Sequence, residues 1–358
     1  MTIEDDNRPA RQRVALTGIS SRAWEHPADR GALTALRELR GFDDVVRGLF
    51  GMWNERGFRL SYLAGAIRVD HRQYPRVHGL FAEAADALDV AERPELYVSQ
   101  QPVITSKSIG MDRPFIVIST AAVEKLDDEE LRTLLGREIG HVRSGHAVYQ
   151  TIMTILTRWV TNISWVPVGV IAMRAIIAAM YEWWRKAELS ADRAGLLAAQ
   201  DPAASLRLFM KLAGGGDLSQ IDTVAFLEQA AEYEGGGDIR DSIHKIGMTA
   251  FNNEPVPVAR ASELQKWVDS GDYARILGGD YPRRDDDRDA SVTADIKDAA
   301  ASYRDTLRDT PDPLVTFARR AAGGAADLVG SAARGARDWA RGRGDGGNSD
   351  GGTNGNGA

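Results

Sequence analysis

The segment from Leu134 to His146, with the sequence LLGREIGHVRSGH, constrains this chain more than any other. Glu138 and His141 stand at the spacing of a hydrolytic metal helix. In such a helix two histidines one turn apart hold a zinc ion, and the glutamate beside the metal takes a proton from bound water. The position four residues before His141 holds Arg137. Because a guanidinium cannot lose its proton to coordinate a metal, the pattern predicts the helix but leaves its metal site one ligand short.

Composition limits the classes of protein to consider. The 358 residues are 27% charged and 43% hydrophobic, which suffices for one large domain or two small ones. The net charge of -7 argues against a general nucleic-acid binder, which needs a dominant basic surface. The chain has no cysteine, so disulfides and thiolate ligands are excluded and any metal must be held by histidine and carboxylates.

No segment predicts secretion or a membrane span. The first six residues are acidic where a signal peptide would have an apolar core. The longest uncharged apolar run, 159–173, has 15 residues, whereas a spanning helix needs about 20. We therefore expect a buried helical hairpin, with shallow membrane contact as the alternative. The predicted location is cytoplasmic or peripherally membrane-associated.

The first half of the chain predicts helices followed by a small sheet. Residues 1–30 are polar and are expected to be flexible, whereas helical spacing of apolar residues predicts helices over 33–53 and after Pro75. Short runs rich in β-branched and aromatic residues predict a small antiparallel sheet, with a turn at 110–114. Its strands are expected at 95–98, 102–105 and 115–119.

The segment around the motif predicts three helical elements. Asp127 can cap a helix and Glu130 can return the bond, so a helix is expected to begin there and to run through the motif. An apolar hairpin is predicted over 147–184, and a further helix over 182–199. His146, rotated by about 140° from His141 on a continuous helix, is expected to be a helix-end or packing residue.

The helix predicted over 182–199 carries Glu188 and Asp192 one turn apart. If the hairpin folds back, Glu188 can approach His141, and Asp192 can accept a hydrogen bond that orients a ring. Alternatively, these carboxylates are solvated helix charges that pair with arginines. The candidate arginines are Arg137, Arg185 and Arg193.

The end of the chain differs from the rest. A mixed-charge run at 283–289 predicts a solvated linker, so we place a domain of residues 31–282, with its motif core at 95–200, before a tail of residues 283–358. The segment 314–341 is a possible amphipathic helix for a membrane surface or a partner, and the Gly-rich residues 342–358 are expected to be disordered.

The stretch 95–200 resembles the HtpX-like family of zinc metallopeptidases, whose relatives include the CAAX prenyl proteases. In that family a sheet leads to an acidic helix start and then to the pattern L-x-H-E-x-x-H-x-x-x-x-H. An apolar hairpin and a helix bearing E-x-x-x-D follow. This chain has the same order at 127–131, 137–146 and 188–192, and 252–260 is similar to a later element. The resemblance implies an α+β, mostly helical, zincin-like domain that hydrolyses peptide bonds.

Site roles follow from that resemblance by position. His141 and Glu188 would hold one zinc ion per chain, Glu138 would be the general base, and Asp192 would orient a ligand. A peptide or protein substrate would add as a strand to the sheet edge. The edge residues are Ile104, Thr105, Ser106, Lys107 and Ser108.

The chain departs from the family at Arg137, which stands where the first histidine ligand belongs. Its fixed charge would repel a dication and could instead bridge Glu138 and Glu188. Three hypotheses follow: a zinc endopeptidase completed by another ligand, a non-catalytic peptide-binding or regulatory descendant, and a membrane-edge adaptor. We expect efficient proteolysis to be impaired or lost.

Overall fold

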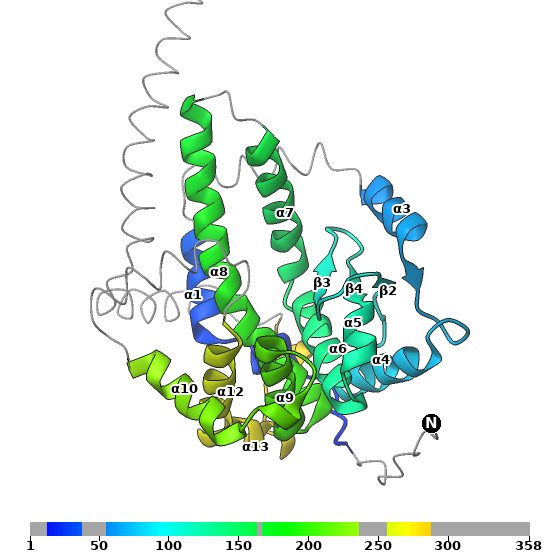
Figure 1. The fold of residues 1–358 in the computed structure, drawn as a ribbon, viewed down its shortest axis with the longest axis vertical. Coiled ribbons are helices and arrows are strands. Elements are labelled where there is room, and N and C mark those ends of the chain that lie inside the picture. The colour runs from blue at the N-terminus through cyan, green and yellow to red at the C-terminus, as the bar shows by residue number, and fades with distance from the viewer. Residues whose placement is uncertain (1–12, 38–54, 163–166, 236–255, 288–358) are drawn as a thin grey trace, which may run out of the picture.

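Helix α6 (Asp128–Arg143) lies at the centre of the fold and carries the motif (Figure 1). The computed structural model describes residues 13–37, 55–162, 167–235 and 256–287. Within them a four-stranded sheet lies to one side of a larger helical layer, so the fold is α+β and mostly helical, as predicted. The remaining helices are α1 (Pro27–Arg37), α3 (Glu55–Gly65), α4 (Pro75–Ala87), α5 (Thr120–Lys125), α7 (His146–Asn162), α8 (Pro167–Ala199), α9 (Pro202–Gly214), α10 (Thr223–Gly235), α12 (Pro257–Asp269) and α13 (Asp272–Leu277), with short 3-10 turns η1 (Ser21–Ala23), η2 (Leu218–Gln220) and η3 (Arg284–Asp287).

The sheet is mixed, with the strand order β1-β2-β4-β3. Strand β3 pairs antiparallel with β4, as expected, whereas β2 runs parallel to β4. The strand predicted at 102–105 is wrong: those residues lead into β3, and the turn at 110–114 joins β3 to β4. Strand β3 is an edge strand, next to the helical layer. The strands are β1 (Ile67–Arg68), β2 (Leu96–Ser99), β3 (Ser106–Ile109) and β4 (Phe115–Ser119).

The central strands β2 and β4 are apolar except for their last residues, Ser99 and Ser119, because both of their faces are covered. Strand β4 is fully buried. Ile116 and Ile118 join the main core with α4 and α6, whereas Phe115 and Val117 form a smaller core beneath α3. Continuous apolar strands are typical of a sheet covered on both sides.

Helix α6 starts where the sequence predicted. Asp127 accepts a hydrogen bond from the backbone N–H of Glu130, and the Glu130 carboxylate accepts one from the N–H of Asp127. The helix is then buried for most of its length. Such burial requires close neighbours on all sides, and α8 is the main one.

Small residues let α6 and α8 touch along their backbones. A Cβ atom added to Gly136 would lie 2.4 Å from the Cβ of Ala198, and one added to Gly140 would lie 2.4 Å from the Cβ of Ala194. A Cβ added to Gly195 would lie 2.5 Å from the Cγ of Arg137. The glycines therefore set the separation at which side chains from the two helices can meet.

The hairpin differs in detail from the prediction. Helix α7 ends at Asn162, and α8 begins at Pro167 and continues without a break to Ala199. The separate helix predicted at 182–199 is thus the second half of α8, which carries Glu188 and Asp192 back to α6 (Figure 1). None of the described helices is both long enough and apolar enough to cross a membrane. Lipid contact by the run 159–173 stays a prediction.

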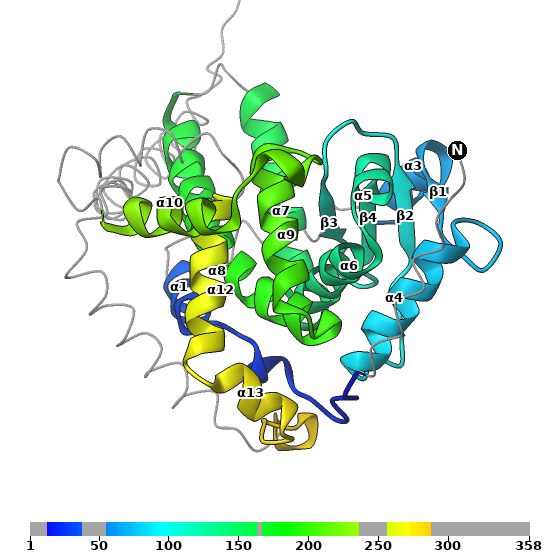
Figure 2. The ribbon, with the colours of Figure 1, turned by 60° about the horizontal axis from the view of Figure 1, so that its bottom comes forward.

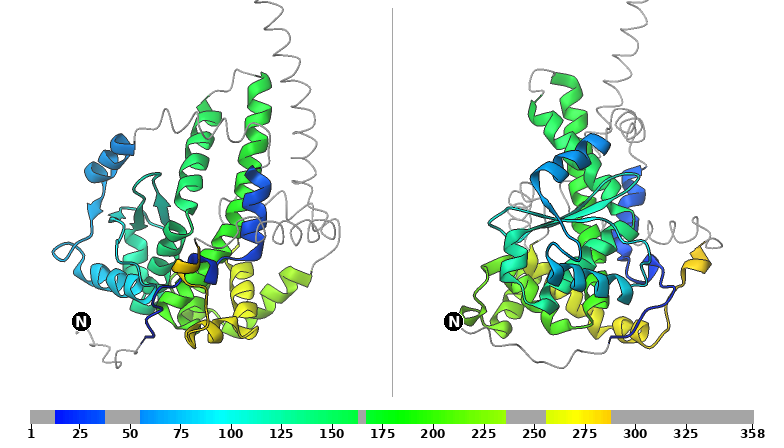
Figure 3. Two further views of the ribbon diagram at one scale, coloured as in Figure 1. Left: turned by 180° about the vertical axis from the view of Figure 1, so that it is seen from behind. Right: turned by 90° about the vertical axis from the view of Figure 1, so that its right-hand side faces the viewer.

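An N-terminal arm, residues 13–37, packs against the motif region. Leu16, Ile19 and Trp24 are buried, so the flexibility expected up to residue 30 does not extend to residues 13–30. Residues 1–12 lie outside the described residues. Helix α1 lies along α8 (Figure 3). The expected helix over 33–53 is described only up to Arg37, as the end of α1.

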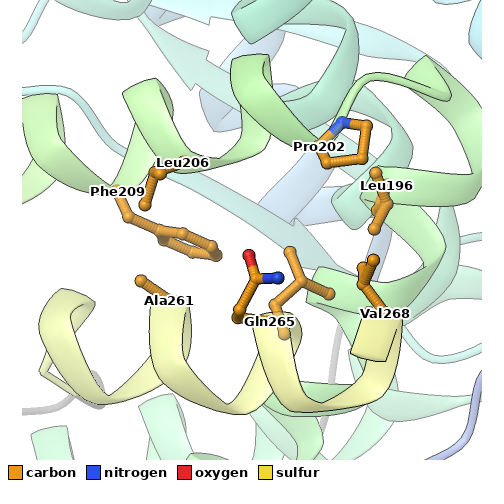
Figure 4. A pocket seen from close by; sticks show the side chains of 8 residues that line it. Leu196, Pro202, Leu206, Phe209, Ala261, Gln265 and Val268 are labelled. Atoms are coloured by element: carbon orange, nitrogen blue, oxygen red, sulfur yellow. The ribbon is translucent and has the colours of Figure 1, made fainter. Parts of the chain in front are cut away.

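The C-terminal helices α12 and α13 pack against the helical layer. Helix α12 lies against α9 (Figure 2), and apolar side chains such as Phe209 and Val268 line the narrow gap between them (Figure 4). After α13, Arg284 pairs with Asp89, and Ser20 donates a hydrogen bond to Asp287. The charged residues 283–287 therefore contact the folded domain. The domain limits at 31 and 282 stay predictions, and the tail segments 314–341 and 342–358 lie outside the described residues.

Gly136→Ala should destabilise the protein by about 1–3 kcal/mol, since the added methyl overlaps Ala198 and the helices must separate. Gly79→Ala in α4 is the matched control. Nothing lies within 4 Å of its added Cβ, and the change should stabilise by about 0.4–1 kcal/mol. Urea unfolding measures both free energies. Equal effects at the two positions would contradict the close helix contact.

Acid should weaken the contact between the N-terminal arm and α12. The His26 ring, whose Nε2 lies 3.7 Å from the Glu263 carboxylate, and a hydrogen bond from the Lys266 ammonium lower the pKa of Glu263 from 4.5 to about 2. A depressed carboxyl pKa contributes stability above the unfolded value and loses it as pH falls. The free energy of unfolding should therefore decrease between pH 4.5 and about 2. Glu263→Gln should flatten this part of the urea-unfolding profile, and an unchanged acid slope would refute the assignment.

Candidate functional site

Arg137 lies inside the protein and makes two ion pairs with α8. Its side chain projects from α6, and the residue is 4% exposed. Nε donates a hydrogen bond to Oδ1 of Asp192 at 2.6 Å, and the terminal NH2 nitrogen donates to Oε2 of Glu188. Glu138 is not bridged by this guanidinium, contrary to the sequence expectation. The position of the missing histidine is thus filled by a paired cation.

A second arginine completes the cluster from α12. Nε of Arg260 donates to Oδ2 of Asp192 at 2.8 Å, and its NH2 nitrogen donates to Oδ1 of the same carboxylate at 2.5 Å. The NH2 nitrogen also lies 3.5 Å from Oε2 of Glu188. Two guanidinium groups therefore face two carboxylates, so the four formal charges balance within the interior. We call Arg137, Glu188, Asp192 and Arg260 the four-charge cluster.

The cluster keeps Glu188 ionised. Burial by itself raises the pKa of this carboxyl, but the charges of Arg137 and then Arg260 outweigh it and hold the pKa of Glu188 below its usual value. Both oxygens of the Asp192 carboxylate accept hydrogen bonds from the two arginines. The sequence-based expectation that it orients a histidine ring is therefore wrong in this structure, where it orients guanidinium groups instead.

His141 reaches the same carboxylate from α6. Its Nε2 lies 3.2 Å from Oε1 of Glu188, so the predicted approach of these two residues is confirmed. Nε2 has no hydrogen-bond partner among the described residues. On its other side the ring stacks on Trp184, with ring centres 4.7 Å apart and an angle of 16° between the planes.

A buried chain of contacts leads from His141 to the N-terminal arm. Nδ1 of His141 lies 3.0 Å from Nδ1 of His146, and Nε2 of His146 lies 3.1 Å from Oδ2 of Asp29. The helix breaks between them, at Ser144 and Gly145, so the rotation calculated for a continuous helix does not apply.

Asp29 is satisfied by several donors at once. Trp183 Nε1 donates to Oδ1 at 2.9 Å, and the Ser190 hydroxyl donates to Oδ2 at 2.6 Å. Burial raises the pKa of Asp29, but His146 and these donors lower it to a net value below the usual one. Burial lowers the pKa of His146, but Asp29 raises it to a net value above the usual one. Asp29 of the N-terminal arm therefore fixes the ring of His146, the second member of the histidine pair.

Glu138 is held by the edge strand. Its Oε1 accepts a hydrogen bond from the Ser106 hydroxyl at 2.6 Å, and its Oε2 accepts one from Ser108 at 2.7 Å. The residue is 2% exposed. Side chains two residues apart on a strand lie on the same face, which is why both serines reach one carboxylate.

The described residues do not fit a zinc site. Such a site needs three protein ligands and an open position, but within the described part of the chain only His141 Nε2 and Glu188 are available, and Arg137 occupies the remaining side. Among the described residues, no group of three or more histidine or carboxylate side chains is arranged to hold a metal ion. Nε2 of His141, which faces Glu188 without an aligned hydrogen bond, keeps the character of a ligand.

A cavity of about 320 Å³ opens beside this site. Its wall comes from β3 and the preceding loop, from α7 and from α8. Ser106 belongs both to the wall and to the Glu138 contact, and Trp184 separates the cavity from the ring of His141. Of the predicted edge residues, Thr105, Ser106 and Lys107 line the cavity, whereas Ser108 is buried against Glu138.

Three residues that matter here were not assigned by the sequence. Asp29 belongs to no motif and lies in a segment predicted to be flexible. Trp184 is one of many apolar residues in its helix. Arg260 was noted within an expected later element, but its partner Asp192 lies 68 positions earlier in the sequence, and nothing in the spacing links them.

The chain is similar to known peptidases. The family model described as "Peptidase family M48" matches residues 71–268. The plastoglobule-localized metallopeptidase 48 (chloroplastic) of Arabidopsis thaliana is 34% identical over 264 residues, which cover 71% of this chain and 74% of that protein. No solved structure matches the chain significantly. The family match covers more than half of the chain and includes α6, α8 and α12, and on this evidence the chain belongs to peptidase family M48, a family of metallopeptidases.

Proposed function

We propose that this chain binds extended peptides at the edge of β3 and does not hydrolyse them efficiently. The observation that carries the proposal is the pairing of Arg137 with Glu188 and Asp192 in the buried interior. The family supplies the class of ligand, a peptide or protein. Hydrolysis by an HtpX-like enzyme would need a bound zinc ion, and the four-charge cluster fills the place where that ion would bind.

Charge supports the loss of metal affinity. A zinc ion between His141 and Glu188 would lie next to a guanidinium that cannot be deprotonated. Displacing Arg137 would break its buried ion pairs, and breaking a buried pair typically costs about 3–5 kcal/mol. The same pairs explain why the site can stay folded without a metal: the carboxylates that would meet a dication meet two cations from α6 and α12.

The edge of β3 supports peptide binding. An unpaired strand edge can accept an extended peptide through main-chain hydrogen bonds, while pockets beside it receive side chains. The cavity beside β3 provides such a pocket, with Ser106 on one side and Tyr181 and Trp184 on the other. Its lining mixes hydroxyl and amide groups with apolar and aromatic surface and one cation, Lys107, which suits side chains that combine an apolar body with a hydroxyl or amide group.

A second candidate function is a zinc-dependent endopeptidase of the HtpX-like kind. Two observations favour it: Glu138 is kept beside the cavity, and Nε2 of His141 has no hydrogen-bond partner among the described residues. This alternative requires Arg137 to move away and a further ligand to come from elsewhere in the chain.

Arg137→His should create zinc binding. The change removes the guanidinium and places a second imidazole one helical turn before His141, so three ligands become available with Glu188. We expect close to one zinc per chain, against a small fraction of that in the unaltered protein. Elemental analysis after purification without a metal-chelating tag measures the zinc content, and a peptide-cleavage assay reports restored hydrolysis.

Arg137→Met is the matched control, because it removes the charge without supplying a ligand. It should bind no zinc and should be destabilised by about 3–5 kcal/mol, because the buried carboxylates of Glu188 and Asp192 each lose one of their paired cations. Stoichiometric zinc in the unaltered protein would refute the proposed loss of the metal site. A zinc-free Arg137→His protein would refute the assignment of His141 and Glu188.

Peptide binding should depend on the main chain of β3. Ser106→Pro removes an N–H at the sheet edge, whereas Ser106→Ala removes only the hydroxyl bonded to Glu138. Proline should weaken peptide binding at least tenfold, and alanine should change it less than threefold. Fluorescence anisotropy with a labelled degenerate decapeptide mixture measures both affinities. Equal losses in the two variants would argue against strand addition.

A further inference from the structure

The outer edge of β3 is made by alternate residues. The carbonyl of Thr105 accepts a hydrogen bond from the N–H of Ser119, so the main-chain groups of Thr105 face β4. In an antiparallel pair the main-chain groups of successive residues point in opposite directions. Ser106, Ser108 and Gly110 therefore present their N–H groups to the side where a peptide would add.

Two of these outer N–H groups already have acceptors on α7. The N–H of Ser108 donates to Oε1 of Gln150 at 3.3 Å, and the N–H of Gly110 donates to Oγ1 of Thr151 at 2.9 Å. A side-chain amide oxygen at Ser108 stands where the main-chain carbonyl of an added strand would stand. The edge is thus partly paired by the protein itself.

The two acceptors differ in how firmly they are held. Thr151 is 1% exposed, and its hydroxyl also donates to the carbonyl of Ala147 at 2.7 Å, so it is fixed by its own helix. Gln150 is half-buried, lines the cavity and makes the longer bond. A glutamine side chain can rotate away from the edge without unfolding a helix turn, whereas Thr151 cannot release Gly110 so readily.

We infer that Gln150 competes with peptide for the N–H of Ser108 and so determines how far along β3 a peptide can pair. The inference rests on the proposed function and concerns the same edge. A peptide pairs first at Ser106, extends to Ser108 only when Gln150 moves away, and stops before Gly110, which Thr151 keeps. Ligands that pair over a longer stretch must displace one protein hydrogen bond.

The expected change in peptide affinity follows from the replacement of one hydrogen bond by another. A neutral hydrogen bond contributes modestly to binding when it replaces another of the same kind. Removing the internal competitor should therefore tighten peptide binding by about threefold to tenfold. The gain should be found for peptides long enough to reach Ser108.

The experiment compares Gln150→Ala with Thr154→Ala. Thr154 lines the same cavity one turn further along α7, and its hydroxyl donates to the main-chain carbonyl of Gln150, so it does not hydrogen-bond to the described residues of β3. Gln150→Glu is a third variant, whose carboxylate can still accept from Ser108. The probe is the fluorescein-labelled degenerate decapeptide mixture, measured by anisotropy. Amide hydrogen exchange at Ser108 is measured without peptide and with it.

Without peptide, we expect Gln150→Ala to speed amide exchange at Ser108 at least tenfold. The variant should bind the decapeptides about threefold to tenfold more tightly than the unaltered protein. When the decapeptides are added, the N–H of Ser108 should become protected again. Thr154→Ala and Gln150→Glu should leave exchange at Ser108 close to its original rate. Gly110 should stay protected in all variants, because Thr151 is unchanged.

Unchanged exchange at Ser108 in Gln150→Ala would overturn the inference, and so would weaker or equal peptide binding with faster exchange. Failure of the proposed function has a different signature. In that case neither the unaltered protein nor Gln150→Ala binds the decapeptides, although exchange at Ser108 is faster, and the competition inference is rejected with it.

Discussion

The buried pairing of arginine and carboxylate side chains between α6, α8 and α12 is the interaction on which the rest of the site depends. Charged groups are costly to bury unless they are paired and hydrogen-bonded, so Arg137 and Glu188 each require the other. Their meeting in turn requires the small residues that bring α6 and α8 together. Metal ligands and structural ion pairs thus have the same geometric requirement, and in this structure Arg137 forms the ion pairs.

Local sequence patterns predicted the elements that depend on local chemistry. The capping pair Asp127 and Glu130, the turn at 110–114 and the motif helix all lie where expected. The strand at 102–105 was placed too early because β-branched residues also occur in the loop before β3. Pro167 begins α8, because proline is compatible with the first turn of a helix.

Contacts between distant segments were the least predictable part of the site. The approach of His141 and Glu188 could be anticipated, because a folded hairpin gives two helices few ways to pack. Nothing in the sequence indicated that Asp29 would reach His146, since a lone carboxylate in a polar segment usually meets water. Its role is visible only when the donors that surround it are brought together by α1 and α8.

The N-terminal arm has a practical consequence for any fragment of this protein. The family match begins at residue 71, so a fragment cut to that segment lacks Trp24 and Asp29. His146, Trp183 and Ser190 would then lose a common acceptor in the interior, and an apolar surface beside them would face solvent. Poor solubility of such a fragment would reflect this missing partner, and supplying residues 13–37 as a separate peptide should rescue it.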